Sequence, residues 1–120
     1  MSDALSIEKI RSQILAKPIF AAIKTTCSYC IKFLSTIDRL NLKDSLQVVD
    51  DVHHAALLKN IRNVVSEVYR HHTVPIVFVN GRFVGGNDSF ESILGRLKAV
   101  MDIAPLDQSL VLTESGKLPK

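Results

Sequence analysis

Short apolar runs alternate with longer segments of helical periodicity along this chain, and this alternation limits the fold more than any other feature. The apolar runs have strand length and suit strands buried on both faces of a sheet; they occupy residues 19–24, 46–50 and 76–79. Apolar residues recur at helical spacing around them, over residues 4–16, 28–40, 54–70 and 89–101. The order predicts an α/β domain whose helices cover both faces of one small sheet.

A hairpin signal follows the third apolar run. Asn80-Gly81 is a strong two-residue turn signal, so residues 76–84 are predicted to form an antiparallel hairpin. The strand-helix-strand order before it predicts a parallel pair. Together these pairs give a four-stranded sheet of mixed orientation.

The last part of the chain carries weaker signals. Residues 104–120 are polar and contain Pro105, Gly116 and Pro119. We predict a partly mobile tail with at most one short helical turn there. The expected organisation is therefore one domain over residues 1–103 and a C-terminal tail over 104–120.

Composition excludes several classes of protein. The chain has 120 residues and a net charge of +3, which does not by itself indicate nucleic-acid binding. It has no apolar run near the ~18 residues of a membrane span. Asp3 and Glu8 make the beginning of the chain unlike a secretory signal or a mitochondrial presequence. We expect a cytoplasmic protein without membrane or nucleic-acid partners, and a mitochondrial location stays open.

The chain has two cysteines, Cys27 and Cys30, separated by two residues. A disulfide between them would close a very small loop, so it would add little stability. The pair therefore indicates chemistry, either a redox couple or half of a metal site. A closed zinc site needs four ligands, and the histidine pairs 53–54 and 71–72 lack the usual ligand spacing. A redox couple is the better interpretation.

The position of the pair predicts different roles for the two thiols. Cys27 follows a predicted strand and opens a predicted helix, whose unpaired N–H groups and partial positive charge favour a thiolate. Lys24 adds a cation nearby. Cys30 comes one helical turn later and should be more buried. This arrangement suits an attacking thiol followed by a resolving thiol.

Three motifs together resemble the glutaredoxins, which are glutathione-dependent members of the thioredoxin-like superfamily. They are Lys24-Thr-Thr-Cys27-Ser-Tyr-Cys30, Thr73-Val74-Pro75 and Gly85-Gly86-Asn87-Asp88. The resemblance implies a thioredoxin-like fold with a four-stranded mixed sheet. It also implies a thiol–disulfide oxidoreductase of the dithiol type, which reduces glutathione mixed disulfides and protein disulfides.

The resemblance also implies a role for each matching position. Cys27 corresponds to the nucleophile and Cys30 to the resolving cysteine. Glutathione is the expected co-substrate, and the residues expected to bind it are Lys24, Tyr29, Arg62, Thr73, Val74, Pro75, Gly86, Asn87 and Asp88. Lys24, Tyr29 and Arg62 would lie near the glycine end, and Asn87 and Asp88 near the γ-glutamyl end. A cis Pro75 would present the Val74 backbone to the cysteine of glutathione. Asp88 could instead be only the N-cap of the last helix.

The residues between the cysteines leave a second function open. Ser28-Tyr29 also occurs in glutaredoxins that share a [2Fe–2S] cluster between two subunits. There, Cys27 of each chain and two glutathione thiols would supply the ligands, and the dimer would store, transfer or sense the cluster. The expected partners are glutathione and glutathionylated or disulfide-containing proteins. The chain would be a monomer, or a homodimer bridged by the cluster.

Overall fold

The structure is a computed structural model that describes residues 3–119, with side chains from residue 7. Its helices are α1 (Asp3–Leu15), α2 (Ser28–Arg39), α3 (Ala55–Tyr69), α4 (Asn87–Ser92) and α5 (Leu97–Asp102). Its strands are β1 (Ile19–Ile23), β2 (Leu46–Asp50), β3 (Ile76–Val79) and β4 (Arg82–Gly85). Short 3₁₀ turns lie at Lys43–Ser45, Leu94–Arg96, Gln108–Leu110 and Glu114–Gly116. Most predicted elements are present, with ends shifted by one or two residues.

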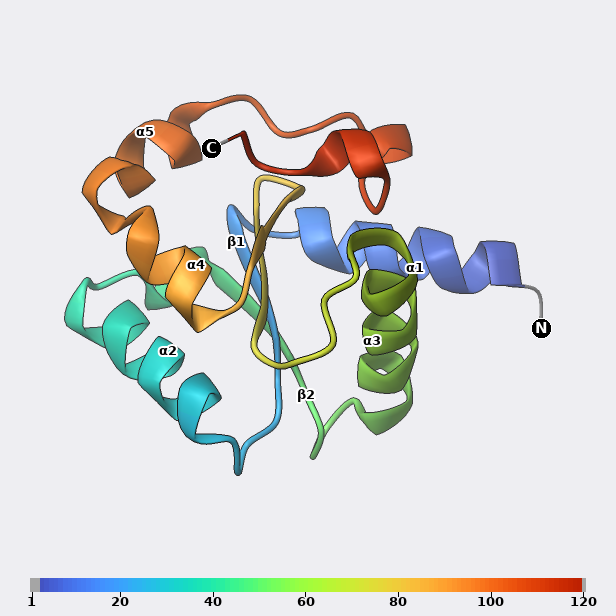
Figure 1. The fold of residues 1–120 in the computed structure, drawn as a ribbon, viewed down its shortest axis with the longest axis horizontal. Helices are drawn as coiled ribbons and strands as arrows, with labels where there is room; N and C mark the ends of the chain where they lie inside the picture. Colours follow the sequence, from blue (N-terminus) through green and yellow to red (C-terminus); the bar gives the residue numbers. More distant parts are fainter. Residues whose placement is uncertain (1–2, 120) are drawn as a thin grey trace.

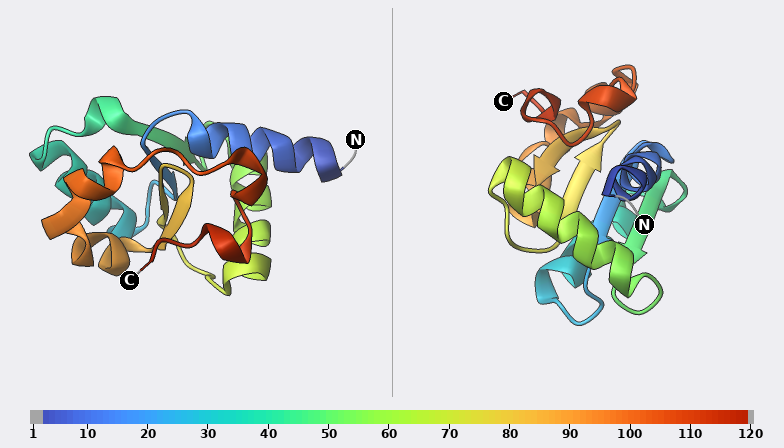
Figure 2. Two further views of the ribbon diagram at one scale, coloured as in Figure 1. Left: turned by 90° about the horizontal axis from the view of Figure 1, so that it is seen from above. Right: turned by 90° about the vertical axis from the view of Figure 1, so that its right-hand side faces the viewer.

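The strands form one mixed sheet in the order β2-β1-β3-β4. β1 pairs with β2 in parallel and with β3 antiparallel, and β3 pairs antiparallel with β4. Helices α1 and α3 cover one face of the sheet, while α2 and α4 cover the other (Figure 1; Figure 2). The predicted thioredoxin-like architecture is confirmed, including the parallel pair and the antiparallel hairpin.

The buried face of α2 connects the core to the cysteine pair. Phe33 and Ile37 on this face are buried, and the Phe33 ring packs edge-on against Phe90 of α4 with 4.9 Å between ring centroids. Burial of such side chains is the main source of stability in a domain of this size. Cys30 lies one turn before Phe33 on the same face, so the packing of α2 carries Cys30 into the core. Cys27, at the helix start, stays at the surface.

The predicted continuous helix over residues 89–101 is wrong. The structure has α4, a 3₁₀ turn and α5 in its place. Ile93 leaves the helical region, with φ −101° and ψ 3°, and the exposed Gly95 follows it. Glycine favours helix continuation less than most residues, and the turn still lets Leu97 and Val100 reach the core. The apolar periodicity was therefore a guide to burial but not to helix continuity.

The prediction of at most one helical turn in residues 104–120 is also wrong. This segment contains two 3₁₀ turns and packs back on the domain, while its last residue lies outside the described part. Val111 is fully buried, and its carbonyl accepts a hydrogen bond of 3.0 Å from Arg11 Nε on α1. The Leu118 N–H donates to the Phe83 carbonyl at the edge of β4. A few apolar residues among polar ones are enough to anchor it.

Candidate active site

The loop between β1 and α2 holds Cys27 at the start of the helix. Cys27 is the N-cap residue, with extended backbone angles (φ −82°, ψ 126°), and no side chain caps the helix there. Its N–H donates to the Lys24 carbonyl at 3.1 Å, and its own carbonyl accepts from the Ile31 N–H at 3.0 Å. The Thr25 N–H donates to Asp51 Oδ1 at 2.9 Å. These contacts fix the loop and leave the first N–H groups of α2 available to the Cys27 sulfur.

The two thiols have opposite environments, as the sequence predicts. Both are free, Cys27 is partly exposed, and Cys30 is only 1% exposed. Hydrogen bonding from the Cys30 backbone N–H is the main cause that lowers the pKa of Cys27; the charge of Lys24 contributes less. Burial raises the pKa of Cys30 to about 11. Near neutral pH, Cys27 is therefore the thiol that can act as a nucleophile.

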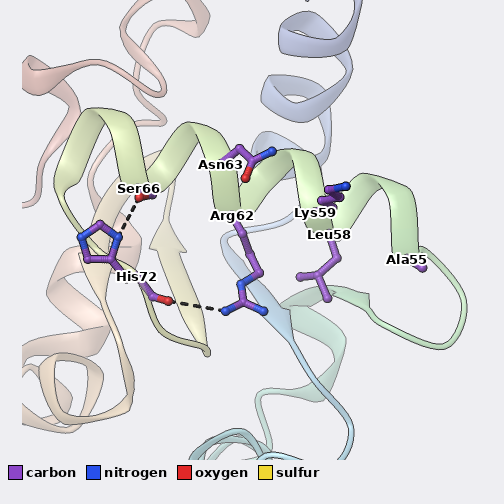
Figure 3. A pocket seen from close by; sticks show the side chains of 7 residues that line it. All are labelled: Ala55, Leu58, Lys59, Arg62, Asn63, Ser66 and His72. Atoms are coloured by element: carbon purple, nitrogen blue, oxygen red, sulfur yellow. Dashed lines mark hydrogen bonds between the residues drawn. The ribbon is translucent and has the colours of Figure 1, made fainter.

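The loop before β3 faces Cys27. The Val74–Pro75 peptide bond is cis, as expected. The Cys27 thiol lies 3.7 Å from the Val74 carbonyl oxygen, to which it can donate a hydrogen bond. Two contacts join this loop to α3: Ser66 Oγ lies 2.7 Å from His72 Nδ1, and Arg62 Nη2 donates to the His72 carbonyl at 3.5 Å (Figure 3). Helix α3 therefore helps to hold the cis-proline loop beside the nucleophile.

One cavity lies between this loop and the start of α4, and we call it the α4 cavity. It has a volume of about 400 Å³ and is lined by Tyr29, His71, Thr73, Val74, Pro75, Gly86, Asn87, Asp88 and Ser89. The fold thus brings together predicted residues from three distant segments of the chain. His71 and Ser89 were not among the predicted binding residues. The only sequence signal for these two residues was their position beside the motifs, because neither of them belongs to a recognisable pattern of its own.

A second cavity, which we call the α3 cavity, lies on the other side of the loop. It measures about 420 Å³ and is lined by Ala55, Leu58, Lys59, Arg62, Asn63, Ser66 and His72 (Figure 3). The Arg62 and Leu58 side chains extend from α3 in the same direction (Figure 3). Lys24, by contrast, lines neither cavity and is exposed between β1 and α2. Of the nine predicted binding residues, seven line the α4 cavity, Arg62 lines the α3 cavity, and Lys24 lines neither.

The polar groups of the α4 cavity include an acceptor without a donor. Asn87 is 4% exposed, and its Nδ2 donates to Glu91 Oε2 at 3.0 Å. Its Oδ1 is buried and has no hydrogen-bond partner within residues 3–119. Asp88 beside it is exposed, and Gly86, not Asp88, is the N-cap residue of α4. The reading of Asp88 as the helix N-cap is therefore wrong. A buried acceptor of this kind is costly unless a ligand or water donates to it.

Two further observations concern membrane-spanning helices and metal sites. No helix within the described residues is both long and apolar enough to cross a membrane. Within the same part of the chain, no three His, Cys, Asp or Glu side chains gather closely enough to share a metal ion.

Comparisons with known proteins agree with this site. The sequence pattern of the glutaredoxin family matches residues 19–84. Glutaredoxin-1 of Saccharomyces cerevisiae is 28% identical over 100 residues, which cover 81% of this chain and 91% of the relative. A buckwheat glutaredoxin–glutathione complex has a TM-score of 0.71 at 23% identity, covering 82% of this chain and 88% of the other. A wheat glutaredoxin has a TM-score of 0.72 at 23% identity, covering 88% and 100%.

The matched region contains the chemical core of the site. It spans more than half of the chain and includes Cys27, Cys30 and the cis-proline loop, whereas Asn87 and Asp88 lie just beyond it. The structural neighbours independently support the thioredoxin-like fold. From these observations, the chain belongs to the glutaredoxin family of thiol–disulfide oxidoreductases.

Proposed function

We propose that this protein reduces glutathione mixed disulfides and protein disulfides, with glutathione as its co-substrate. One observation carries the proposal: a partly exposed thiol of lowered pKa lies beside a cis-proline loop that has a polar cavity on each side. A tripeptide with charged groups at both ends suits such a site. That a structural neighbour is a glutaredoxin–glutathione complex supports the choice of ligand.

The reduction of a mixed disulfide needs only Cys27. Its thiolate attacks the glutathione sulfur of the substrate, the substrate S–S bond breaks, and the substrate sulfur leaves as a thiolate that takes up a proton. Cys27 now carries glutathione through a disulfide. The thiolate of a second glutathione attacks the glutathione sulfur of this disulfide, which releases oxidised glutathione and restores the Cys27 thiolate. In the net reaction the substrate sulfur is reduced to a thiol and the sulfur of the incoming glutathione is oxidised to the disulfide level, while the glutathionyl sulfur stays at the disulfide level throughout.

The reduction of a protein disulfide also uses Cys30. Cys27 attacks one sulfur of the substrate disulfide and forms a mixed disulfide with the substrate protein. Cys30 must then lose its proton and attack Cys27, which releases the second substrate thiol and leaves a Cys27–Cys30 disulfide. Two glutathione molecules reduce this bond. Because burial raises the pKa of Cys30 to about 11, we expect resolution by Cys30 to be slower than attack by Cys27.

The proposed placement of glutathione follows the charges of the two cavities. Its cysteine would pair with the Val74 backbone beside Cys27. Its glycine carboxylate would point toward Arg62, with Lys24 near that end as the resemblance implies, whereas Tyr29 lines the α4 cavity at the other end. Its γ-glutamyl end would enter the α4 cavity, where the Asp88 carboxylate can accept hydrogen bonds from the ammonium group. Thr73, Pro75 and Gly86 would form the walls between these ends.

The test is turnover of a glutathionylated peptide, coupled to glutathione reductase, with the wild-type protein and the Cys27→Ser and Cys30→Ser variants. We expect Cys27→Ser to abolish turnover, because serine supplies no thiolate. Cys30→Ser should retain turnover of the glutathionylated peptide and lose turnover of a protein disulfide. Robust activity of Cys27→Ser would contradict the proposal.

A second function is supported by the surroundings of Cys27. Tyr29 and Ile31 on α2, close to Cys27, are each 56% exposed and could contact a second copy. The buried Cys30 leaves Cys27 as the accessible thiol of each chain, so a [2Fe–2S] cluster would need two chains and two glutathione thiols as its four ligands. The bound cluster would supply iron–sulfur storage, transfer or sensing. Visible absorbance above ~400 nm that requires glutathione and Cys27 would support this function; a colourless monomer after anaerobic reconstitution would refute it.

A further inference from the structure

His71 is a titratable group of the α4 cavity for which the proposed reaction has no use. It precedes the cis-proline loop, lies in the cavity wall and is partly buried. Its Nε2 lies 3.4 Å from the Thr73 hydroxyl oxygen, and its ring packs edge-on against Phe83 with 5.5 Å between ring centroids. A Cβ atom on Gly86 would lie 3.4 Å from His71 Cε1. The imidazole is therefore held at the cavity by contacts on several sides.

The groups around His71 include no anion bonded to it. Asp88 of α4 and Tyr29 of α2 line the same cavity, Glu91 of α4 accepts from Asn87, and His72 is the neighbour in the loop. Strand β4 presents the uncharged Phe83, and Tyr69 at the end of α3 stacks on the other side of that ring. None of the salt bridges of residues 3–119 includes His71. Burial lowers the pKa of His71, so the imidazole is mainly neutral at pH 7.

The α4 cavity thus contains two kinds of polar group. The exposed Asp88 is a carboxylate, which suits an ammonium group. His71 is an imidazole without an anion, which suits a carboxylate. An α-amino acid head carries both charges on one carbon and could satisfy both kinds of group at once.

We propose that His71 is a pH-dependent contact for the carboxylate of the α-amino acid head that enters the α4 cavity. The inference rests on the proposed function, because it takes the γ-glutamyl end of glutathione as that head. Binding then takes up a proton onto His71 when the pH lies between the pKa values of the free and the occupied site. The bound carboxylate stabilises the imidazolium, and the resulting pair strengthens binding in mildly acidic solution.

The test uses NMR titration of the histidine ring signals in the Cys30→Ser variant, in which glutathione can be trapped on Cys27. Three forms are compared: reduced, joined to glutathione, and joined to cysteamine, which brings no carboxylate. We expect the measured pKa of His71 to rise by roughly one pH unit with glutathione and not to rise with cysteamine.

Kinetics give a second readout. Between pH 7.5 and 5.5, KM for a glutathionylated peptide should fall about threefold more in the wild type than in His71→Gln, whose glutamine cannot be protonated. This pH range brackets the ordinary histidine pKa of about 6.5. An unchanged or lowered pKa of His71 in the form joined to glutathione would overturn this inference while leaving the proposed function intact. Failure of Cys27 to take up glutathione at all would overturn both.

Discussion

The α3 and α4 cavities lie on opposite sides of the cis-proline loop and differ in chemistry. The α3 cavity has the cations Lys59 and Arg62 and no acidic side chain in its lining. The α4 cavity has the Asp88 carboxylate and no lysine or arginine in its lining. A ligand with a simple carboxylate at one end and an amino acid head at the other is therefore accommodated better in one orientation than in the reverse. From this difference we propose that charge, more than cavity size, sets the direction in which the ligand binds.

Filling the α4 cavity should have the largest effect. In Gly86→Val, the Cβ atom would lie 3.6 Å from the Pro75 carbonyl oxygen, and the added methyl groups would occupy the space that we propose for the γ-glutamyl end. We expect KM for a glutathionylated peptide to rise about tenfold or more, equivalent to ~1.4 kcal/mol of binding. Coupled turnover measures it.

Gly95→Val is the matched control, because nothing lies within 4 Å of a Cβ atom at that position. Alkylation of Cys27 by iodoacetamide should be unchanged in both variants. An unchanged KM in Gly86→Val would mean that the α4 cavity does not hold the ligand.

Removing the protein charge at either end of the ligand should have a smaller effect, and it tests the direction in which the ligand binds. Arg62→Gln should raise KM about three- to fivefold for glutathionylated substrates, or ~0.6–1 kcal/mol, and should have no effect when the glycine carboxylate is amidated. Asp88→Asn should have a similar effect that disappears when the γ-glutamyl amine is acetylated. Steady-state kinetics with the two blocked substrates distinguish the ends. In the opposite pattern, the effect of Arg62→Gln would disappear with the acetylated substrate and the effect of Asp88→Asn with the amidated substrate. That result would reverse the assigned direction.

The pH dependence of Cys27 alkylation should show the lowered pKa directly. Thiolates react and thiols do not, so the rate rises as the pH rises through the pKa. Because hydrogen bonding at the start of α2 lowers the pKa of Cys27, half of the maximal rate should be reached below the ~8.5 of an ordinary thiol. Lys24→Gln should raise this midpoint by less than about half a pH unit, since an exposed charge is screened. A midpoint at or above the ~8.5 pKa of an ordinary thiol would contradict the account of Cys27.

The C-terminal segment should affect stability and not chemistry. Val111→Ala removes buried methyl groups far from the two cavities, and we expect the free energy of unfolding to fall by about 1–2 kcal/mol. Urea unfolding measures the loss. Turnover of the glutathionylated peptide should match the wild type; a marked loss of turnover in the folded variant would link the segment to the site.

Much of the fold up to residue 84 could be predicted because its signals are local. The strands are uniformly apolar runs, the helices repeat at 3.6 residues, and Asn80-Gly81 adopts the positive φ angles that a two-residue turn needs. The break between α4 and α5 depends on how Ile93 and Leu97 reach a shared core, which periodicity does not encode. The hydrogen bond from Arg11 to the Val111 carbonyl joins segments 100 residues apart, so no local pattern could show it.

The candidate site could be predicted in its chemistry and only partly in its geometry. The spacing of Cys27 and Cys30 predicts unlike thiols, because a helix start and a helix interior differ in burial and hydrogen bonding. The resemblance assigned Arg62 and Asp88 to opposite ends of the ligand, and they line different cavities. It assigned Tyr29 to the same end as Arg62, but Tyr29 lines the α4 cavity. His71 and Ser89 enter the α4 cavity through the local course of the backbone. Such placement depends on tertiary packing.

The most direct test of the central claim is a structure of the Cys30→Ser variant with glutathione joined to Cys27. The account predicts the glycine carboxylate near Arg62, the cysteine of glutathione alongside the Val74 backbone, and the γ-glutamyl head in the α4 cavity. A glutathione bound in the reverse direction, or lying outside both cavities, would contradict it.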